Sequence, residues 1–219
     1  IAAEPERSEG GSVPTLCSDI EFSNVSFSYG EGREVLKKLD LRIPMGKVTA
    51  VIGGNGAGKS TLFKLLMRLY EPSSGEIRFA GDNIGGYELA DWRRHFAVVS
   101  QGSPLIGGTV RENITYGLER EVSDEELVAV AREANCYDCI MAKPGGFDEE
   151  VGLDGSNFSG GQGQCISIAR AMLRNADYLL LDEATSNLDV MSEALVTEAM
   201  GKLMRGKTTV MIAHNYAAT

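Results

Sequence analysis

The sequence has no apolar run of roughly eighteen residues or more, the length that a membrane-spanning helix needs. Basic residues are also scarce, 21 against 31 acidic ones, so the formal net charge is −10. Proteins that bind the backbone of nucleic acids concentrate lysine and arginine, so this charge argues against a nucleic-acid partner. The given sequence begins with Ile1 and shows no signal-peptide pattern, and we expect it to be part of a longer product.

The four cysteines and two histidines do not have the paired spacing of a zinc site of the usual kind, which needs four ligands. Cys136 and Cys139 form a C-x-x-C pair, but no second pair accompanies them. We interpret them as small apolar residues in a helix, in a reducing compartment. With 219 residues, 43% of them hydrophobic and 24% charged, the chain is expected to form one globular domain, with room for an insert.

A glycine-rich segment is the feature around which the rest of the sequence is organised. It follows an apolar run, residues 48–52, that predicts a buried strand, and it precedes a helix with the stripe Leu62, Leu65, Leu66 and Leu69. The segment consists of Gly53, Gly54, Asn55, Gly56, Ala57, Gly58, Lys59 and Ser60. Strand, glycines and helix in this order are the context of a P-loop, whose backbone N–H groups surround phosphate oxygens. Lys59 can then reach the β- and γ-phosphates, and the Ser60 hydroxyl can bind Mg²⁺.

Polar side chains follow three further apolar segments. Gln101 lies just after residues 96–99, Asp182 and Glu183 follow residues 178–181, and His214 follows residues 208–213. In open parallel sheets ligands bind at the carboxyl ends of the strands, so we expect these residues to converge on one nucleotide. Asp182 would contact Mg²⁺ and Glu183 would activate the attacking water. Gln101 would touch Mg²⁺ or water, and His214 would hold the γ-phosphate.

The regions on either side of this core have different patterns. Residues 20–29 alternate with one slip, as in a bulged strand, and residues 39–43 alternate again, which predicts a small antiparallel sheet. Residues 102–164 look helical, with capping boxes at Thr109–Glu112 and Ser123–Glu126. We therefore expect an α/β protein with a P-loop NTPase (RecA-like) core, a mainly parallel sheet, an N-terminal antiparallel β subdomain and a helical insert. The predicted boundaries are a linker at 1–18, the nucleotide-binding core at 19–101 and 165–219, and the insert at 102–164.

A third capping box, Ser159 with Gln162, heads another helix. Gly160 and Gly161 lie between them and would leave backbone donors exposed for a second anion. One P-loop together with a second phosphate-binding helix end suggests that two chains share two nucleotides.

From about residue 20 onward, these segments together resemble the ATP-binding cassette family, and within it the nucleotide-binding domain of an exporter-type transporter. Residues 53–60 resemble the Walker A motif, residues 178–182 Walker B with Glu183 as its catalytic glutamate, and residues 158–162 the signature motif. Gln101 resembles the Q-loop residue, Asp189 ends a segment similar to the D-loop, and His214 resembles the switch histidine. The resemblance also implies nucleotide contacts by Thr61, and by Tyr29 as the residue that stacks on adenine. Residues 108–114 and 150–152 resemble segments typical of exporters.

The resemblance implies a domain that binds ATP and Mg²⁺, hydrolyses ATP, and powers export of a substrate through ATP-dependent dimerisation. Its partners would be a second nucleotide-binding domain, in a homodimer or a heterodimer, and a transmembrane domain in the same polypeptide, joined by the linker. Its place would be the cytoplasmic face of the cell membrane. Two alternatives stay open: a soluble ABC ATPase with no part in transport, and a regulatory module that hydrolyses ATP weakly. Phe158 replaces the usual leucine, and Gly163, Gln164 and Cys165 stand where basic residues are common. These departures bear on the rate of ATP hydrolysis and on the strength of dimerisation.

Overall fold

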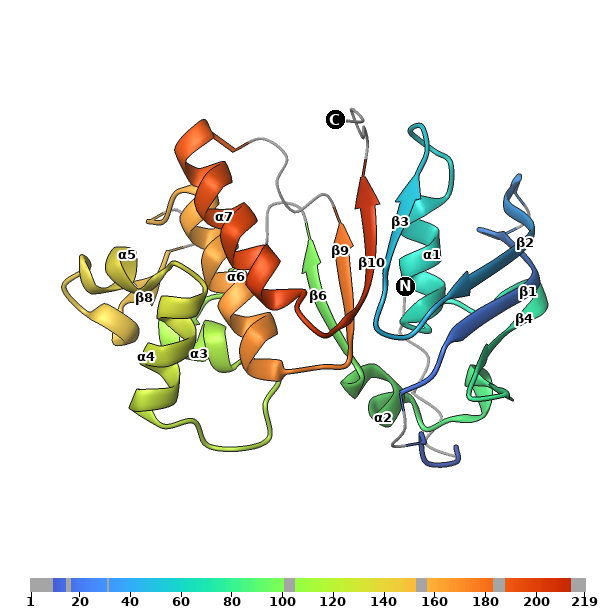
Figure 1. Ribbon diagram of the computed structural model, residues 1–219, viewed down its shortest axis with the longest axis horizontal. Coiled ribbons are helices and arrows are strands. Elements are labelled where there is room, and N and C mark those ends of the chain that lie inside the picture. The colour runs from blue at the N-terminus through green and yellow to red at the C-terminus, as the bar shows by residue number, and fades with distance from the viewer. Residues whose placement is uncertain are drawn as a thin grey trace. The chain divides into compact units, whose positions relative to one another are not determined.

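A computed structural model describes residues 10–14, 17–30, 32–100, 105–152, 157–182 and 188–213 (Figure 1). The chain divides into two compact units, one with Ile1–Phe96, Asp177–Leu180 and Lys207–Thr219, the other with Ala97–Ala176 and Leu181–Gly206. The division passes through strands β6 (Phe96–Ser100) and β9 (Tyr178–Asp182) of a four-stranded sheet with the order β3-β10-β9-β6. None of the helices in the part of the chain that the structure describes is long and apolar enough to cross a membrane.

An antiparallel sheet forms the N-terminal part of the first unit. Its strands are β1 (Ile20–Ser28), β2 (Glu34–Ile43), β4 (Ser74–Phe79) and β5 (Asp82–Asn83), in the order β2-β1-β4-β5. The register of β1 against β2 shifts between Phe22 and Val25, where Asn24 takes a left-handed backbone with φ 49°. The predicted antiparallel sheet and its bulged first strand are both confirmed.

The strand ahead of the glycine-rich loop, β3 (Val48–Ile52), pairs in parallel with β10 (Thr208–Ala213). The prediction that β3 is buried was wrong, because Val48 and Ile52 are 52% and 60% exposed. Among the described strands β3 is the last of its sheet, and Val51 packs against the core while Val48 and Ile52, on the alternate face, are exposed. That core joins β1, β4 and the helix after the loop around Trp92, which is fully buried on α2 (Leu89–Arg94).

The helix after the loop, α1 (Lys59–Leu66), is shorter than the apolar stripe predicted. Leu62, Leu65 and Leu66 are buried as expected, but Leu69 is 57% exposed. Groups from α2 hold the end of α1. The Trp92 Nε1–H donates to the Leu66 carbonyl at 2.7 Å, and the guanidinium of Arg93 donates to the next carbonyl, that of residue 67, at 3.0 Å. These donors satisfy carbonyls that a helix end leaves without partners.

The second unit is mostly helical, as predicted for the insert (Figure 1). A two-stranded ribbon of β7 (Gly108–Thr109) and β8 (Glu150–Val151) accompanies its helices. α6 contacts α3, α4 and α7, and Ile166, Ile168 and Ala169 on α6 are buried. The helices are α3 (Val110–Thr115), α4 (Asp124–Glu133), α5 (Tyr137–Met141), α6 (Gly160–Arg174) and α7 (Val190–Leu203).

The capping boxes of the insert show how far local sequence decides helix starts. Thr109 and Glu112 form both bonds of the box at α3. At α4 the Ser123 hydroxyl accepts from the Glu126 N–H, but the Glu126 carboxylate pairs with Arg120 instead of closing the box. A charged donor makes a stronger hydrogen bond than a neutral N–H, which accounts for the half-formed box.

Candidate nucleotide-binding site

Two glycines of the predicted P-loop take conformations that only glycine adopts readily. Gly56 and Gly58 have φ of 78° and 88°, and Gly58 is the residue that precedes α1. A β-carbon on Gly58 would lie 2.8 Å from Leu36 Cδ2 and 3.3 Å from the Val35 carbonyl oxygen. The Ala57 N–H donates to the Gly54 carbonyl at 3.2 Å and closes a turn within the loop. The loop is therefore folded tightly against β2, ahead of the helix N-terminus that would attract an anion.

Lys59 lies inside this loop. Its ammonium donates to the Gly53 carbonyl at 2.6 Å and to the Gly54 carbonyl at 3.1 Å, and the residue is only 8% exposed. Ser60 is exposed at the first turn of α1. Among the described residues the partners of this buried cation are carbonyl dipoles, which leave its charge uncompensated, so the loop favours an anion beside Lys59.

Tyr29 follows β1 and reaches α1. Its hydroxyl shares a hydrogen bond of 3.1 Å with the Thr61 hydroxyl, and the tyrosine is 39% exposed. The structure thus brings the residue predicted to stack on adenine next to the first turn of the helix that follows the glycines. Lys59, Ser60 and Thr61 all belong to that turn.

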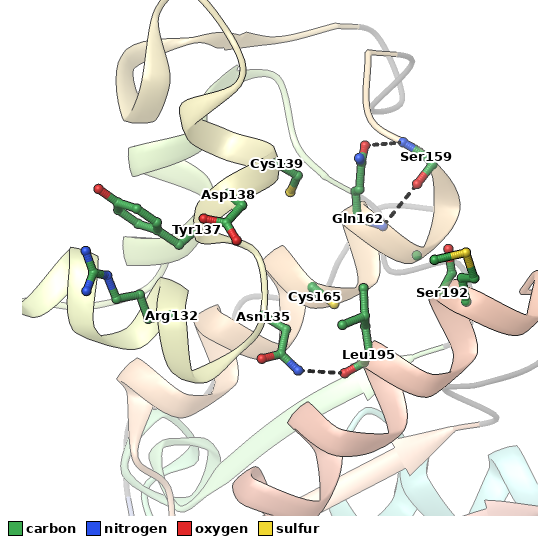
Figure 2. A pocket seen from close by; sticks show the side chains of 12 residues that line it. Arg132, Asn135, Tyr137, Asp138, Cys139, Ser159, Gln162, Cys165, Ser192 and Leu195 are labelled. Atoms are coloured by element: carbon green, nitrogen blue, oxygen red, sulfur yellow. Dashed lines mark hydrogen bonds between the residues drawn. The ribbon is translucent and has the colours of Figure 1, made fainter.

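The N-terminus of α6 has the capping box that the sequence predicts. The Gln162 N–H donates to Ser159 Oγ at 3.3 Å, and the Ser159 N–H donates to Gln162 Oε1 at 2.9 Å, the two dashed lines beside Ser159 in Figure 2. Both residues line a cavity of about 560 Å³, together with side chains of α5 and α7. The Ser159 hydroxyl is accordingly held in place before any ligand arrives.

Gly161 has a packing role that the sequence did not indicate. A β-carbon at this position would lie 2.4 Å from Ser192 Cβ, so α6 and α7 approach each other too closely for a larger residue. Gly160 has more room, since the nearest atom to such a carbon is Leu188 Cδ2 at 3.8 Å. Of the two glycines assigned to anion binding, only Gly160 is free of this helix contact.

The segment just before α6 is tied to the β7–β8 ribbon. The Asn157 side chain accepts from the Gly152 N–H at 3.1 Å and donates to the Glu150 carbonyl at 2.8 Å. Lys143 donates to the Asn157 carbonyl at 2.6 Å, and its ammonium lies 5.1 Å from the centre of the buried Phe158 ring. Phe158 is thus a buried apolar residue where leucine is usual. Glu150 and Gly152 of the exporter-like segment are hydrogen-bonded to Asn157, which directly precedes the signature segment.

Gln164 also has a role that its side-chain type alone did not reveal. It is buried on α6 and donates through Nε2 to the Ser100 carbonyl at 3.4 Å, at the last residue of β6. Ser100 directly precedes Gln101 in the sequence. The helix headed by Ser159 is therefore bonded to the strand that leads into the predicted Q-loop.

Asp189 caps α7. Its carboxylate accepts from the Met191 N–H at 3.1 Å and the Ser192 N–H at 3.0 Å, and bonds to Ser192 hold the pKa of Asp189 below its usual value. Asp182 is half-buried at the end of β9. The predicted residues Gln101, Glu183 and His214 lie outside the described residues.

The cysteines are packed as small side chains. Cys136 and Cys165 are buried, and burial raises the pKa of Cys165 to about 12 and raises that of Cys136 as well. Cys139 is half-buried and its thiol donates to the Cys136 carbonyl at 3.1 Å. Within the described ranges, no group of three or more histidine, cysteine, aspartate or glutamate residues could hold a metal ion.

Comparison with known proteins decides the family. The model of the family described as ABC transporter matches residues 36–186, more than half of the chain. The chain belongs to the ABC transporter family. ATP-binding cassette sub-family B member 5 of Homo sapiens is 45% identical over 213 residues, which are 96% of this chain and 16% of that protein. The ATP-dependent lipid A-core flippase of Syntrophus aciditrophicus is 43% identical over 209 residues, 95% of this chain and 34% of that protein.

A solved structure gives the same answer for the fold. A bacterial Atm1-family ABC exporter with ATP bound has a TM-score of 0.86 and 36% sequence identity, over 93% of this chain and 36% of that chain. The chain thus spans little more than a third of the length of such relatives at most. The predictions of the family, of the P-loop α/β fold and of an ATP-binding domain are confirmed.

Proposed function

We propose that this ABC domain binds and hydrolyses ATP to power export of a substrate across a membrane, through ATP-dependent dimerisation. The observation that carries the proposal is one chain with two glycine-containing helix N-termini, the loop ahead of α1 and the Ser159 end of α6, and we assign an anion to each. They lie in different units of the chain. The names of the flippase and of the exporter support transport as the process that is powered.

Binding begins at the loop of residues 53–58, whose N–H groups would surround the phosphates while Lys59 exchanges its two carbonyls for phosphate oxygens. Thr61 and Tyr29 would hold the α-phosphate side and the adenine of the same nucleotide. An ammonium makes stronger hydrogen bonds to the charged oxygens of a polyphosphate than to neutral loop carbonyls, so this exchange favours nucleotide binding.

Hydrolysis is assigned to residues that follow the apolar strands. The Ser60 hydroxyl, the Asp182 carboxylate and the Gln101 amide each offer oxygen, the ligand that Mg²⁺ prefers, and we assign Mg²⁺ to these three residues. When bound, Mg²⁺ would neutralise charge on the β- and γ-phosphates. Glu183 would orient the attacking water and accept its proton, and His214 would hold the γ-phosphate through an imidazole hydrogen bond.

A second nucleotide-binding domain would complete each site. Ser159, with the N–H groups of Gly160 and Gly161 and with Gln162, would face the γ-phosphate bound to the partner domain, and Asp189 would end the D-loop at the same interface. The bonds from Asn157 to Gly152 and Glu150 would connect this interface to the exporter-like segment that faces a transmembrane domain. We place that domain in the same polypeptide, before a linker at residues 1–18, and place the ATPase at the cytoplasmic face of the cell membrane. We also retain the core at 19–101 and 165–219 and the insert at 102–164.

The variant Glu183→Gln tests this proposal. It should bind ATP but lose turnover, and therefore accumulate as an ATP-bound dimer. Light scattering of the variant with and without MgATP measures the change in mass, with Glu183→Gln/Lys59→Ala as the matched control that cannot hold the phosphates. A variant that stays monomeric at saturating MgATP would contradict ATP-dependent dimerisation.

A further inference from the structure

Three aromatic rings form a cluster around Tyr29. The centre of the Tyr29 ring lies 4.8 Å from that of Phe27 and 5.2 Å from that of Tyr70, both at nearly right angles, and the Phe27 and Tyr70 centres are 5.5 Å apart. Edge-to-face contacts at these distances are attractive. Phe27 is buried, whereas Tyr29 and Tyr70 are 39% and 45% exposed, so the cluster is anchored in the core and opens to solvent.

α1 adds a cation to this cluster. Lys64 lies three residues after Thr61, so both side chains leave the same face of the helix. The Lys64 ammonium is 5.2 Å from the centre of the Tyr29 ring and 5.9 Å from that of Tyr70, within the range of a cation–π contact. Thr61 bonds the hydroxyl of Tyr29, so α1 holds this ring both at its hydroxyl and over its face.

The position of Tyr70 is itself fixed by the end of α1. Arg68 has a left-handed backbone with φ 49°, and the Leu69 N–H donates back to the Lys64 carbonyl at 2.8 Å. The Arg68 guanidinium donates to the carbonyls of Tyr87, at 2.7 Å, and Gly85, at 3.2 Å. The hydrogen bonds of Leu69 and Arg68 therefore fix the turn that leads into Tyr70.

We propose that Tyr70 and Lys64 are positioning residues that hold the Tyr29 ring ready to stack on the nucleotide base. This inference rests on the proposed contact between Tyr29 and adenine. A ring that is already ordered loses less conformational entropy when a base stacks on it, so preorganisation increases affinity. Tyr70 contacts the ring at nearly a right angle and Lys64 lies over one face, and the base would stack on the opposite face. The effect concerns the base alone, since the phosphates bind at the glycine-rich loop.

Calorimetric titration of the chain with MgATP and with magnesium tripolyphosphate, which has no base, tests the inference. Tyr70→Ala should weaken MgATP binding roughly two- to tenfold, the change in affinity expected for the loss of one aromatic pair. It should leave tripolyphosphate binding unchanged. Tyr70→Phe keeps the ring and should bind both ligands as the unaltered chain does. In a Tyr29→Ala background, Tyr70→Ala should cause no further loss, because a positioning residue acts only through the ring that it positions.

Lys64→Gln provides a second arm that leaves the aromatic core intact, with the exposed Lys37→Gln as a matched change of charge in the same unit. Lys64→Gln should weaken MgATP binding about two- to fivefold, as for a partly exposed cation–π pair, and Lys37→Gln should not.

Tighter MgATP binding by Lys64→Gln would show that Lys64 occupies the face needed by the base, and would overturn its role. Unchanged MgATP affinity in Tyr70→Ala, equal losses for both ligands, or additive losses in the double variant would overturn the role of Tyr70. If Tyr29→Ala itself binds MgATP normally, the proposed adenine contact fails instead.

Discussion

Two glycines of the same loop allow the packing of the P-loop to be separated from its backbone strain. Gly56 and Gly58 both have positive φ, at 78° and 88°, so alanine at either position has a strained backbone, which costs about 1–2 kcal/mol. A β-carbon at Gly56 would meet no atom within 4 Å, whereas one at Gly58 would press on the side chains of Leu36 and Val35 and on the Val35 carbonyl. Overpacking of this kind costs a further 1–3 kcal/mol or so.

We therefore expect Gly58→Ala to lower the free energy of unfolding by about 2–5 kcal/mol, and Gly56→Ala by only about 1–2 kcal/mol. Urea denaturation without nucleotide measures both values, because neither depends on ligand binding. The difference between the two variants isolates the contact with β2. Equal losses in the two variants would refute the tight packing of this loop against β2, and a larger loss in Gly56→Ala would refute it more strongly.

Three further changes probe single contacts. Trp92→Phe removes the donor to the Leu66 carbonyl at the end of α1 and should lower the free energy of unfolding by about 1–3 kcal/mol in urea titrations; no loss would show that this bond does not hold the helix end. The pKa of Asp189 is lowered from 3.8, so its carboxylate stabilises the fold above that pH and the gain is lost as the pH falls through the lowered value. The stability difference between the unaltered chain and Asp189→Asn should accordingly shrink in acid, and a constant difference from pH 7 to 3 would contradict the cap. Asn157→Ala should speed hydrogen exchange at the Gly152 amide about tenfold or more, because that amide loses its acceptor; unchanged exchange would separate residues 150–152 from the signature segment.

Features that depend on neighbouring residues were predictable from the sequence. The turn before Lys59 and the capping boxes at Thr109 and Ser159 depend on contacts between residues only a few positions apart. The helices α1, α3 and α6 begin where these patterns predict. The box at Ser123 formed only in part, because the Arg120 side chain competes for its glutamate. That competition is also local, but it depends on side-chain conformations that spacing does not reveal.

Features that depend on distant contacts were not predictable. The apolar stripe extends α1 to Leu69, but the helix ends at Leu66, where Trp92 supplies a donor from 26 residues away. The exposure of β3 follows from its place at the end of the sheet, which an apolar run cannot indicate. The contacts of Tyr70 with Tyr29 likewise join segments that are 41 residues apart in the sequence.

The central claim is that each ATPase site combines the P-loop of one chain with the Ser159 helix end of another. Lys59→Ala would damage both P-loops of a homodimer, and Ser159→Arg would damage both signature motifs. In a mixed dimer both lesions fall in one site, so the other site has an intact P-loop and Glu183 from one chain and an intact signature from its partner.

Phosphate release from the mixture, at protein concentrations that allow dimerisation, is the direct measurement, with crosslinking to verify that mixed dimers form. The account predicts that two inactive variants together recover part of the ATPase activity. If mixed dimers form and no activity returns, the Ser159 helix end does not complete the site of the partner chain, and the account is contradicted.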